Sequence, residues 1–352
     1  MRSRRTVLAA LTALAGSPFP ALAQGVSNRE LLMQVEAKIP LGEVRGRIDH
    51  LAVDLARRRL FIAELGNDSL GVVDLDARSV AHRIRGLREP QGVAYLPEAD
   101  VLLAANGGDG TVERFRGVDL APLGRASLGA DADNLRPDPT GGGVVWVGHG
   151  GAWPRTGGGL TPIDAQSGRP VGAAIPLPAH PESFQLEAGG PRIFANIPRA
   201  GGVVVVLDRA ARQQVASWSV PRLGSNFPMA LDERGGRLFV AFRDPPTLAT
   251  LDLGTGSVIG QLAMCGDADD LFLDARRHRL YAVCGEGAVD VFDASPPSDG
   301  RATAPRHLAR VPTSPGARTG LFVPEFDRLF VAARAQAGEP AALWVLRPDA
   351  PP

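Results

Sequence analysis

One pattern of apolar and polar positions recurs seven times along the chain, at steps of 42, 43, 48, 45, 42 and 49 residues. Each copy holds an apolar strand, a turn rich in Asp, Arg, Gly or Pro, and a second strand ending in Phe-Val-Ala or a similar phrase. A turn and a third strand follow, and apolar and polar residues alternate within the strands. The second strands are expected at residues 59–63, 101–105, 144–147, 192–196, 237–241, 279–283 and 328–332.

This repeat predicts the architecture of the chain. A period of about 45 residues made of short alternating strands is typical of four-stranded propeller blades. No stretch after residue 23 has the 3.6-residue apolar stripe of a helix, which excludes an α/β solenoid, and a leucine-rich repeat would be shorter. We therefore expect an all-β, seven-bladed β-propeller that forms a single domain over residues 24–352.

The two ends of the repeat region predict how the ring closes. Residues 343–347 form the third strand of the last copy, and few residues follow them. The last blade therefore lacks a fourth strand from its own repeat. Residues 33–39 precede the first copy and have strand character, so we expect this N-terminal strand to complete the last blade and leave few open edges.

Short phrases of the repeat carry a family resemblance. The sequence Asp-Arg-Leu-Phe-Val-Ala occurs at residues 327–332, Val-Val-Asp-Leu occurs at residues 72–75, and turns such as residues 106–110 are rich in Gly, Asn and Asp. These phrases resemble the YVTN repeat of the YncE-like periplasmic β-propellers, over nearly the whole chain after residue 23. The resemblance implies a periplasmic propeller. It leaves function open, because such propellers act as binding modules, scaffolds or enzymes.

The N-terminus resembles a targeting segment. Arg2, Arg4 and Arg5 precede the apolar residues 6–16, and Ala21-Leu22-Ala23 fits the small-x-small cleavage rule. Residues 1–23 are thus a predicted signal peptide cleaved after Ala23, and residues 3–8 are compatible with either a twin-arginine or an ordinary secretory leader. A periplasmic or secreted location follows. No other stretch approaches the ~20 apolar residues of a membrane span, so we expect no integral membrane segment in the mature chain.

The two cysteines predict a covalent link, and the charge of the chain limits the classes of binding partner. Cys265 and Cys284 fall at the same end of one predicted blade, so a disulfide is expected, with a soft-metal site as the alternative. The chain has 38 basic and 38 acidic residues, and 5% of its residues are aromatic. Such a chain lacks the basic surface and stacking platforms of nucleic-acid binding. We expect a monomer that binds a small molecule or a periplasmic protein.

Polar residues just before the first strand of each copy identify the candidate site. First strands line the channel of a propeller, so the residues that precede them meet at its mouth. The predicted ligand-binding residues are Asp49, His50, Gln91, Asp133, Asn134, His180, Glu182, Asn226 (or its neighbour Phe227), Asp269, Asp270 and Arg318.

This collection allows three interpretations. The polar residues would fix the blades and channel water, bind a ligand or partner, or hold a cation. Asp133, Glu182 and Asp269 would suit Ca²⁺ or Mg²⁺, and nearby histidines would also admit Zn²⁺ or Mn²⁺. A catalytic site would be of the metal-dependent lactonase type, a hydrolase with His50 or His180 as general base and Arg318 on a substrate carboxylate. The leading interpretation is a binding module without catalysis, and the hydrolase is its alternative.

Overall fold

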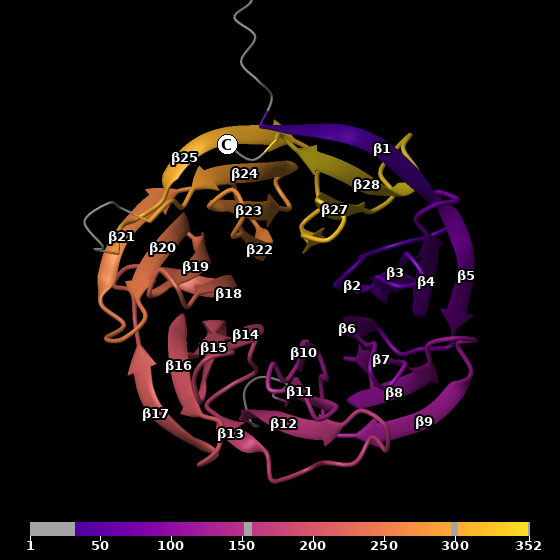
Figure 1. Cartoon of the computed structure of the whole chain (residues 1–352), viewed down its shortest axis with the longest axis horizontal. Helices are drawn as coiled ribbons and strands as arrows, with labels where there is room; N and C mark the ends of the chain where they lie inside the picture. The colour runs from indigo at the N-terminus through magenta and orange to yellow at the C-terminus, as the bar shows by residue number, and fades with distance from the viewer. Residues whose placement is uncertain (1–31, 151–156, 297–301, 351–352) are drawn as a thin grey trace, which may run out of the picture. The chain divides into compact units, whose positions relative to one another are not determined.

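Seven four-stranded antiparallel sheets surround a central axis (Figure 1). The computed structural model describes residues 32–150, 157–296 and 302–350. The predicted signal peptide, residues 1–23, lies outside this part of the chain. The all-β, seven-bladed β-propeller expected from the repeat is confirmed.

Six blades run from the channel outward in chain order, and the seventh takes β1 as its rim strand. The innermost strands are β2 (Leu51–Asp54), β6 (Pro90–Leu96), β10 (Leu135–Pro137), β14 (Ser183–Leu186), β18 (Gly224–Asp232), β22 (Ala268–Asp274) and β26 (Thr319–Val323). The second strands are β3 (Arg59–Glu64), β7 (Val101–Asn106), β11 (Val144–Gly150), β15 (Arg192–Ile197), β19 (Arg237–Asp244), β23 (Arg279–Cys284) and β27 (Arg328–Ala333). All seven predicted second strands are therefore confirmed.

The outer half of each blade is equally regular. The third strands are β4 (Ser69–Asp74), β8 (Thr111–Arg116), β12 (Gly158–Asp164), β16 (Val203–Asp208), β20 (Pro246–Asp252), β24 (Ala288–Asp293) and β28 (Ala341–Pro348). The rim strands are β5 (Ser79–Arg85), β9 (Pro122–Ser127), β13 (Ile175–Leu177), β17 (Gln213–Trp218), β21 (Val258–Ala263), β25 (Arg306–Pro312) and β1 (Met33–Gly42). Two short 3₁₀ turns, η1 (Leu65–Asn67) and η2 (Pro198–Ala200), follow second strands.

The hydrophobic core lies between neighbouring blades. Second and third strands are buried on both faces, which explains their almost continuous apolar runs, whereas rim strands alternate exposed and half-buried positions. Between blades one and two, Phe61 and Val72 pack in one cluster with Val93, Leu102 and Phe115. Each blade thus buries the face of the next.

An arginine at the start of a second strand links several blades to the next one. Arg237 donates to the Asp232 carboxylate at 2.7 Å and to the Ala294 carbonyl of the following blade at 2.5 Å. Arg59 and Arg192 repeat this arrangement, each bridging an acidic side chain of its own blade to a carbonyl of the next. These ion pairs explain the recurrent Arg that opens the second strands.

The N-terminal strand completes the last blade, as predicted. β1 pairs antiparallel with β28, with Met33 opposite Pro348 and Gly42 opposite Ala341, so it extends three residues beyond the expected end at residue 39. The Asp349 amide also donates to the Leu32 carbonyl at 3.1 Å. The rim strand at the top of Figure 1 therefore joins the two ends of the described chain and closes the ring.

The predicted disulfide is also confirmed. Cys265, just before β22, is bonded to Cys284, the last residue of β23, and their Cα atoms lie 5.9 Å apart. Both residues are buried. The bond fixes the segment that leads blade six into the channel mouth. In the described part of the chain, no helix has the length and apolar character needed to cross a bilayer.

Candidate functional site

The segments before the first strands are fixed at the channel mouth by a repeated backbone hydrogen bond. The amides of Asp49, Asp133 and Glu182 each donate to a carbonyl at the end of the second strand of their own blade, at 2.7, 2.9 and 3.1 Å. The same bond in blades one, three and four gives their side chains equivalent positions. The sequence repeat thus becomes a ring of side chains in space.

These side chains line a cavity of about 510 Å³ at the channel mouth. We call it the mouth cavity. Its lining contains six carboxylates, four arginines, two histidines and one glutamine, with Leu65 and Phe227 as the two apolar side chains. Its members are Arg47, Asp49, His50, Leu65, Glu89, Gln91, Asp131, Asp133, His180, Glu182, Arg199, Phe227, Arg243, Asp269 and Arg318. All seven blades contribute.

Most of the predicted ligand-binding residues reach this cavity. Asp49, His50, Gln91, Asp133, His180, Glu182, Asp269 and Arg318 line it. Asn134 and Asp270 line a second cavity of about 200 Å³, which also includes His50 and Asp269. Asn226 lies in neither lining: it is fully buried and donates to the Asn196 side chain and the Val203 carbonyl. At this ambiguous position, Phe227 is the residue that lines the mouth cavity.

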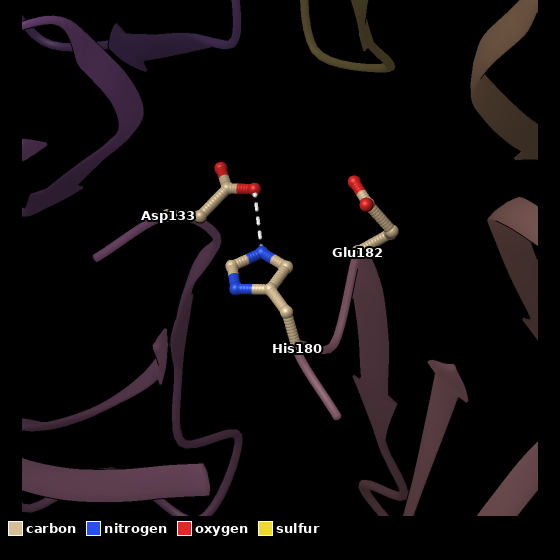
Figure 2. A group of neighbouring side chains, drawn as sticks. All are labelled: Asp133, His180 and Glu182. Carbon is tan, nitrogen blue, oxygen red and sulfur yellow. Dashed lines mark hydrogen bonds and ion pairs between the residues drawn. The ribbon is translucent and has the colours of Figure 1, made fainter. Parts of the chain in front are cut away.

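Blades three and four contribute a compact cluster of two carboxylates and one imidazole. Figure 2 shows Asp133, His180 and Glu182 converging, with a dashed line from Asp133 to the imidazole. The His180 Nε2 atom lies 3.3 Å from Asp133 Oδ2, and one ligand atom from each of the three residues lies within 4.8 Å of the others. Among the described residues, the Glu182 carboxylate has no hydrogen-bond or ion-pair partner. We call this group the carboxylate–histidine cluster.

Blades five and seven each contribute an arginine that is already paired. Arg243 donates to Asp269 at 2.5 Å, and Arg318 lies 3.1 Å from the same carboxylate through Nε. Arg318 also donates to Asp267 at 3.0 Å. The Arg243 guanidinium stacks on the Phe227 ring, 3.4 Å from its centroid. Asp269, predicted with Asp133 and Glu182 as a metal ligand, therefore faces two arginines.

His50 lies between two carboxylates of different blades. Its Nδ1 atom is 3.6 Å from Asp270 and its Nε2 atom is 3.7 Å from Asp49. Burial of the ring opposes its charge, but the carboxylates of Asp270 and Asp49 outweigh burial and raise the pKa of His50 to about 10. Such a ring holds its proton at neutral pH, and a protonated imidazole donates rather than accepts.

The carboxylate–histidine cluster also has shifted pKa values. Burial, together with the charge of Asp133, raises the pKa of Glu182 to about 7. Burial alone would lower the pKa of His180, but its hydrogen bond to Asp133 and the charge of that carboxylate raise it to about 9. Burial likewise raises the pKa of Asp49 to about 7, despite the opposing charge of His50. Burial is thus the main cause of the raised pKa values of the two acids, whereas the neighbouring carboxylates raise the pKa of His180 against the effect of burial.

Deeper in the channel, the guanidinium of Arg136 faces the second cavity. It has one hydrogen bond, to the Leu135 carbonyl at 3.1 Å, and burial lowers its pKa against the nearby charges of Asp270 and Asp133. The second cavity therefore combines charged groups with apolar side chains such as Leu51, Met229 and Phe272. This is the arrangement expected where water and charged groups enter a propeller.

Arg243 and Arg47 line the mouth cavity but were absent from the predicted ligand-binding residues. Arg243 comes from the end of β19, which continues three residues past the predicted strand end at 241. Arg47 precedes Asp49 by two residues and donates to it at 2.8 Å. For Arg243 the available signal was Phe242, which continues the apolar run of the strand beyond residue 241. For Arg47 it was a basic residue in the same loop as Asp49.

The arrangement offers three kinds of chemistry. The carboxylate–histidine cluster presents metal ligands or a cation site. Arg243 and Arg318 present anion-binding groups that are paired with carboxylates, and Phe227 offers a small apolar surface. The cluster has His180 in place of Asp269, which was the third member of the predicted metal set.

The comparisons with known proteins identify the fold. No family model matches the chain, and no curated protein matches its sequence. A chain in the structure titled Kuenenia stuttgartiensis Hydrazine Synthase superimposes with a TM-score of 0.73 at 15% identity, covering 93% of this chain and 99% of that one. A chain in the structure titled Crystal Structure of Mitotic Checkpoint Complex gives 0.73 at 12% identity, covering 99% and 100%. At such low identity these similarities show a shared seven-bladed β-propeller fold.

Proposed function

We propose that this protein is a binding module that takes up a small charged ligand in the mouth cavity. One observation carries the proposal: among the described residues, Glu182 lines an open cavity of about 510 Å³ with no ion-pair partner, and the neighbouring Asp133 pairs only with His180, while Arg243 and Arg318 pair with other carboxylates. Buried or half-buried carboxylates that lack a partner are costly, and a cationic group of a ligand would offset that cost.

The lining also constrains the chemistry of the ligand. With two apolar side chains among fifteen, the mouth cavity favours a polar molecule over a lipid or an aromatic compound. The ligand should carry an amine or another cationic group for the cluster. An additional anionic group would compete with Asp267 and Asp269 for Arg318.

The same proposal includes export of the protein as a YncE-like propeller. The disulfide supports it, because disulfides persist in oxidising compartments. The repeat phrases and the N-terminal basic and apolar segments are the further support. A periplasmic or secreted binding module, acting on a small ligand or on a charged segment of a protein partner, is the resulting function.

Thermal unfolding in the presence of small probes tests the binding proposal. Putrescine, lysine and citrate serve as cationic, zwitterionic and anionic probes, with EDTA present to exclude metal ions. Putrescine and lysine should raise the Tm of the wild-type protein, and citrate should leave it unchanged. The double variant Asp133→Asn/Glu182→Gln should lose the increase.

Glu43→Gln is the matched control, because Glu43 is exposed on the segment that leads into the mouth and loses the same charge. It should respond as the wild type does. A Tm increase that persists in the double variant would place binding elsewhere. The absence of any Tm increase with putrescine and lysine would also contradict the proposal.

A metal-dependent hydrolase is a second candidate, favoured by the three clustered metal ligands. A cation held by them would polarise an ester carbonyl from the cavity side. The raised pKa of His50 does not favour that residue as a general base at neutral pH. Hydrolysis of dihydrocoumarin that is abolished by EDTA and restored by Zn²⁺ or Mn²⁺ would establish this activity, and unchanged hydrolysis under EDTA would exclude it.

A further inference from the structure

The hydrogen bonds of His180 determine which of its nitrogens faces the cavity. Its Nδ1 atom lies 2.9 Å from the Gly150 carbonyl oxygen. A carbonyl only accepts, so Nδ1 carries a hydrogen and donates it. In the neutral ring the lone pair is then on Nε2, which is directed at Asp133.

This orientation leaves two acceptors facing each other. Nε2 of neutral His180 and Oδ2 of Asp133 are 3.3 Å apart, and neither has a hydrogen to share. A positively charged species between them removes the conflict, and it is either a proton or a metal ion. The imidazole of His180 is almost completely buried, with 4% of its surface exposed, so its orientation is fixed by packing.

The contact with Gly150 is also the outer contact typical of a metal ligand. Histidines that bind metals commonly donate their other ring N–H to a backbone carbonyl or a carboxylate, which fixes the tautomer. The pair of His180 and Gly150 satisfies this condition without a metal present. The site is therefore preorganised through the protein backbone.

The distances within the cluster fit a single ion. Ligand atoms at about 2.1 Å from a tetrahedral ion lie about 3.4 Å from one another. The 3.3 Å separation of Asp133 and His180 already agrees with this value. The Glu182 atom lies within 4.8 Å of both, and its long, half-buried side chain can rotate to bring it to the ion.

We propose that Asp133, His180 and Glu182 bind one divalent transition-metal ion, of the Zn²⁺ or Mn²⁺ kind, with an open coordination position towards the mouth cavity. The nitrogen ligand favours these ions over Ca²⁺ and Mg²⁺, which prefer an all-oxygen shell. The proposal goes beyond uptake of an organic ligand, because the ion binds with no other molecule present.

Isothermal titration of untagged, EDTA-treated and desalted protein with ZnCl₂, MnCl₂ or CaCl₂ tests this site. One equivalent of Zn²⁺ or Mn²⁺ should bind, with Ca²⁺ at least about 100-fold weaker. Glu182→Gln should weaken Zn²⁺ binding by at least about 10-fold, the order of loss seen even for outer contacts of metal sites. Glu43→Gln, the exposed control, should bind as the wild type does.

A spectroscopic measurement on the wild type avoids dependence on variants of a buried residue. Pulsed electron paramagnetic resonance of the Mn²⁺ form should show coupling to an imidazole nitrogen. Absence of that coupling, absence of stoichiometric binding, or equal weakening by Glu182→Gln and Glu43→Gln would each overturn the proposal. Because this titration contains no organic probe and the Tm experiment contains EDTA, the metal site and the proposed function can fail separately.

Discussion

At the scale of single residues, the charge of His50 links the mouth cavity to the stability of the ring. The imidazole of His50 is held between Asp49 and Asp270, which belong to blades one and six. Its protonated form therefore bridges two blades across the channel. This contact exists only in the folded protein.

The raised pKa of His50 predicts how stability depends on pH. Because the pKa rises from 6.5 in the unfolded chain to about 10, His50 stabilises the fold fully below about pH 6.5 and loses this contribution as the pH rises to about 10. The Tm of the wild type should fall between pH 7 and 10, and His50→Gln should make this fall shallower. His82→Gln, an exposed histidine on β5, should keep the wild-type slope. An unchanged slope in His50→Gln would contradict the assignment.

Gly92 illustrates how a single backbone contact positions Asp133. A Cβ atom at Gly92 would lie 2.0 Å from the Asp133 carbonyl oxygen, so blades two and three approach each other through this residue. Gly92→Ala should cost about 2 kcal/mol of folding stability, because backbone atoms must move to admit the methyl group. Urea unfolding measures the loss. In Gly224→Ala the new Cβ has a nearest neighbour at 3.8 Å, so a loss as large as that of Gly92→Ala would refute the steric argument.

At the scale of elements, the arginine links between blades should contribute more to folding stability than exposed ion pairs do. Arg237 is 2% exposed and pairs with Asp232, whereas Arg306 is an exposed partner of Asp293. Arg237→Met leaves a largely buried carboxylate and the Ala294 carbonyl without their partner, and we expect a loss of about 3–5 kcal/mol. Arg306→Met should cost less than about 1 kcal/mol.

Chemical denaturation of both variants compares the two kinds of pair. Similar losses would mean that the links between blades contribute no more than surface contacts.

The strands also show which parts of the site could be predicted. The second strands follow from their apolar runs because the repeat places each run between the same two turns. Asn226 could not be placed correctly from the pattern, because β18 has a register shift between Asn226 and Met229. The shift buries the Asn226 amide between blades and leaves Phe227 in the lining of the mouth cavity. A bulge of this kind leaves the order of apolar and polar residues unchanged and is therefore invisible in the sequence.

The ion pairs within the mouth cavity could not be predicted from the sequence either. The repeat predicts that Asp133, Glu182 and Asp269 share one end of the channel, and the cavity contains all three. It does not predict that Arg243 and Arg318 meet Asp269, because these contacts cross blade boundaries that the repeat treats as equivalent. The ring of positions was thus predictable, but the pairing within it required three-dimensional geometry.

At the scale of the whole molecule, the propeller depends on β1. Removing residues 1–42 exposes the edge of β28 and leaves the last blade with three strands. Such an edge is a template for association. The truncated protein should form oligomers or aggregates in size-exclusion chromatography and should lose its cooperative thermal transition. A protein beginning at Gln24 should stay monomeric and keep the cooperative transition. A monomeric truncation with an unchanged Tm would show that the closing strand is dispensable.

The closing strand also fixes the order of events during synthesis. Among the strands that the structure describes, β1 leaves the ribosome first and its partner β28 leaves last. Blades one to six can pair internally as they emerge, whereas the seventh cannot be completed until β28 has been synthesised. Contacts between such distant segments form slowly, since the intervening chain must first be ordered. The nascent protein therefore carries β1 without its partner until β28 has emerged, and the ring closes only after the other six blades have been synthesised.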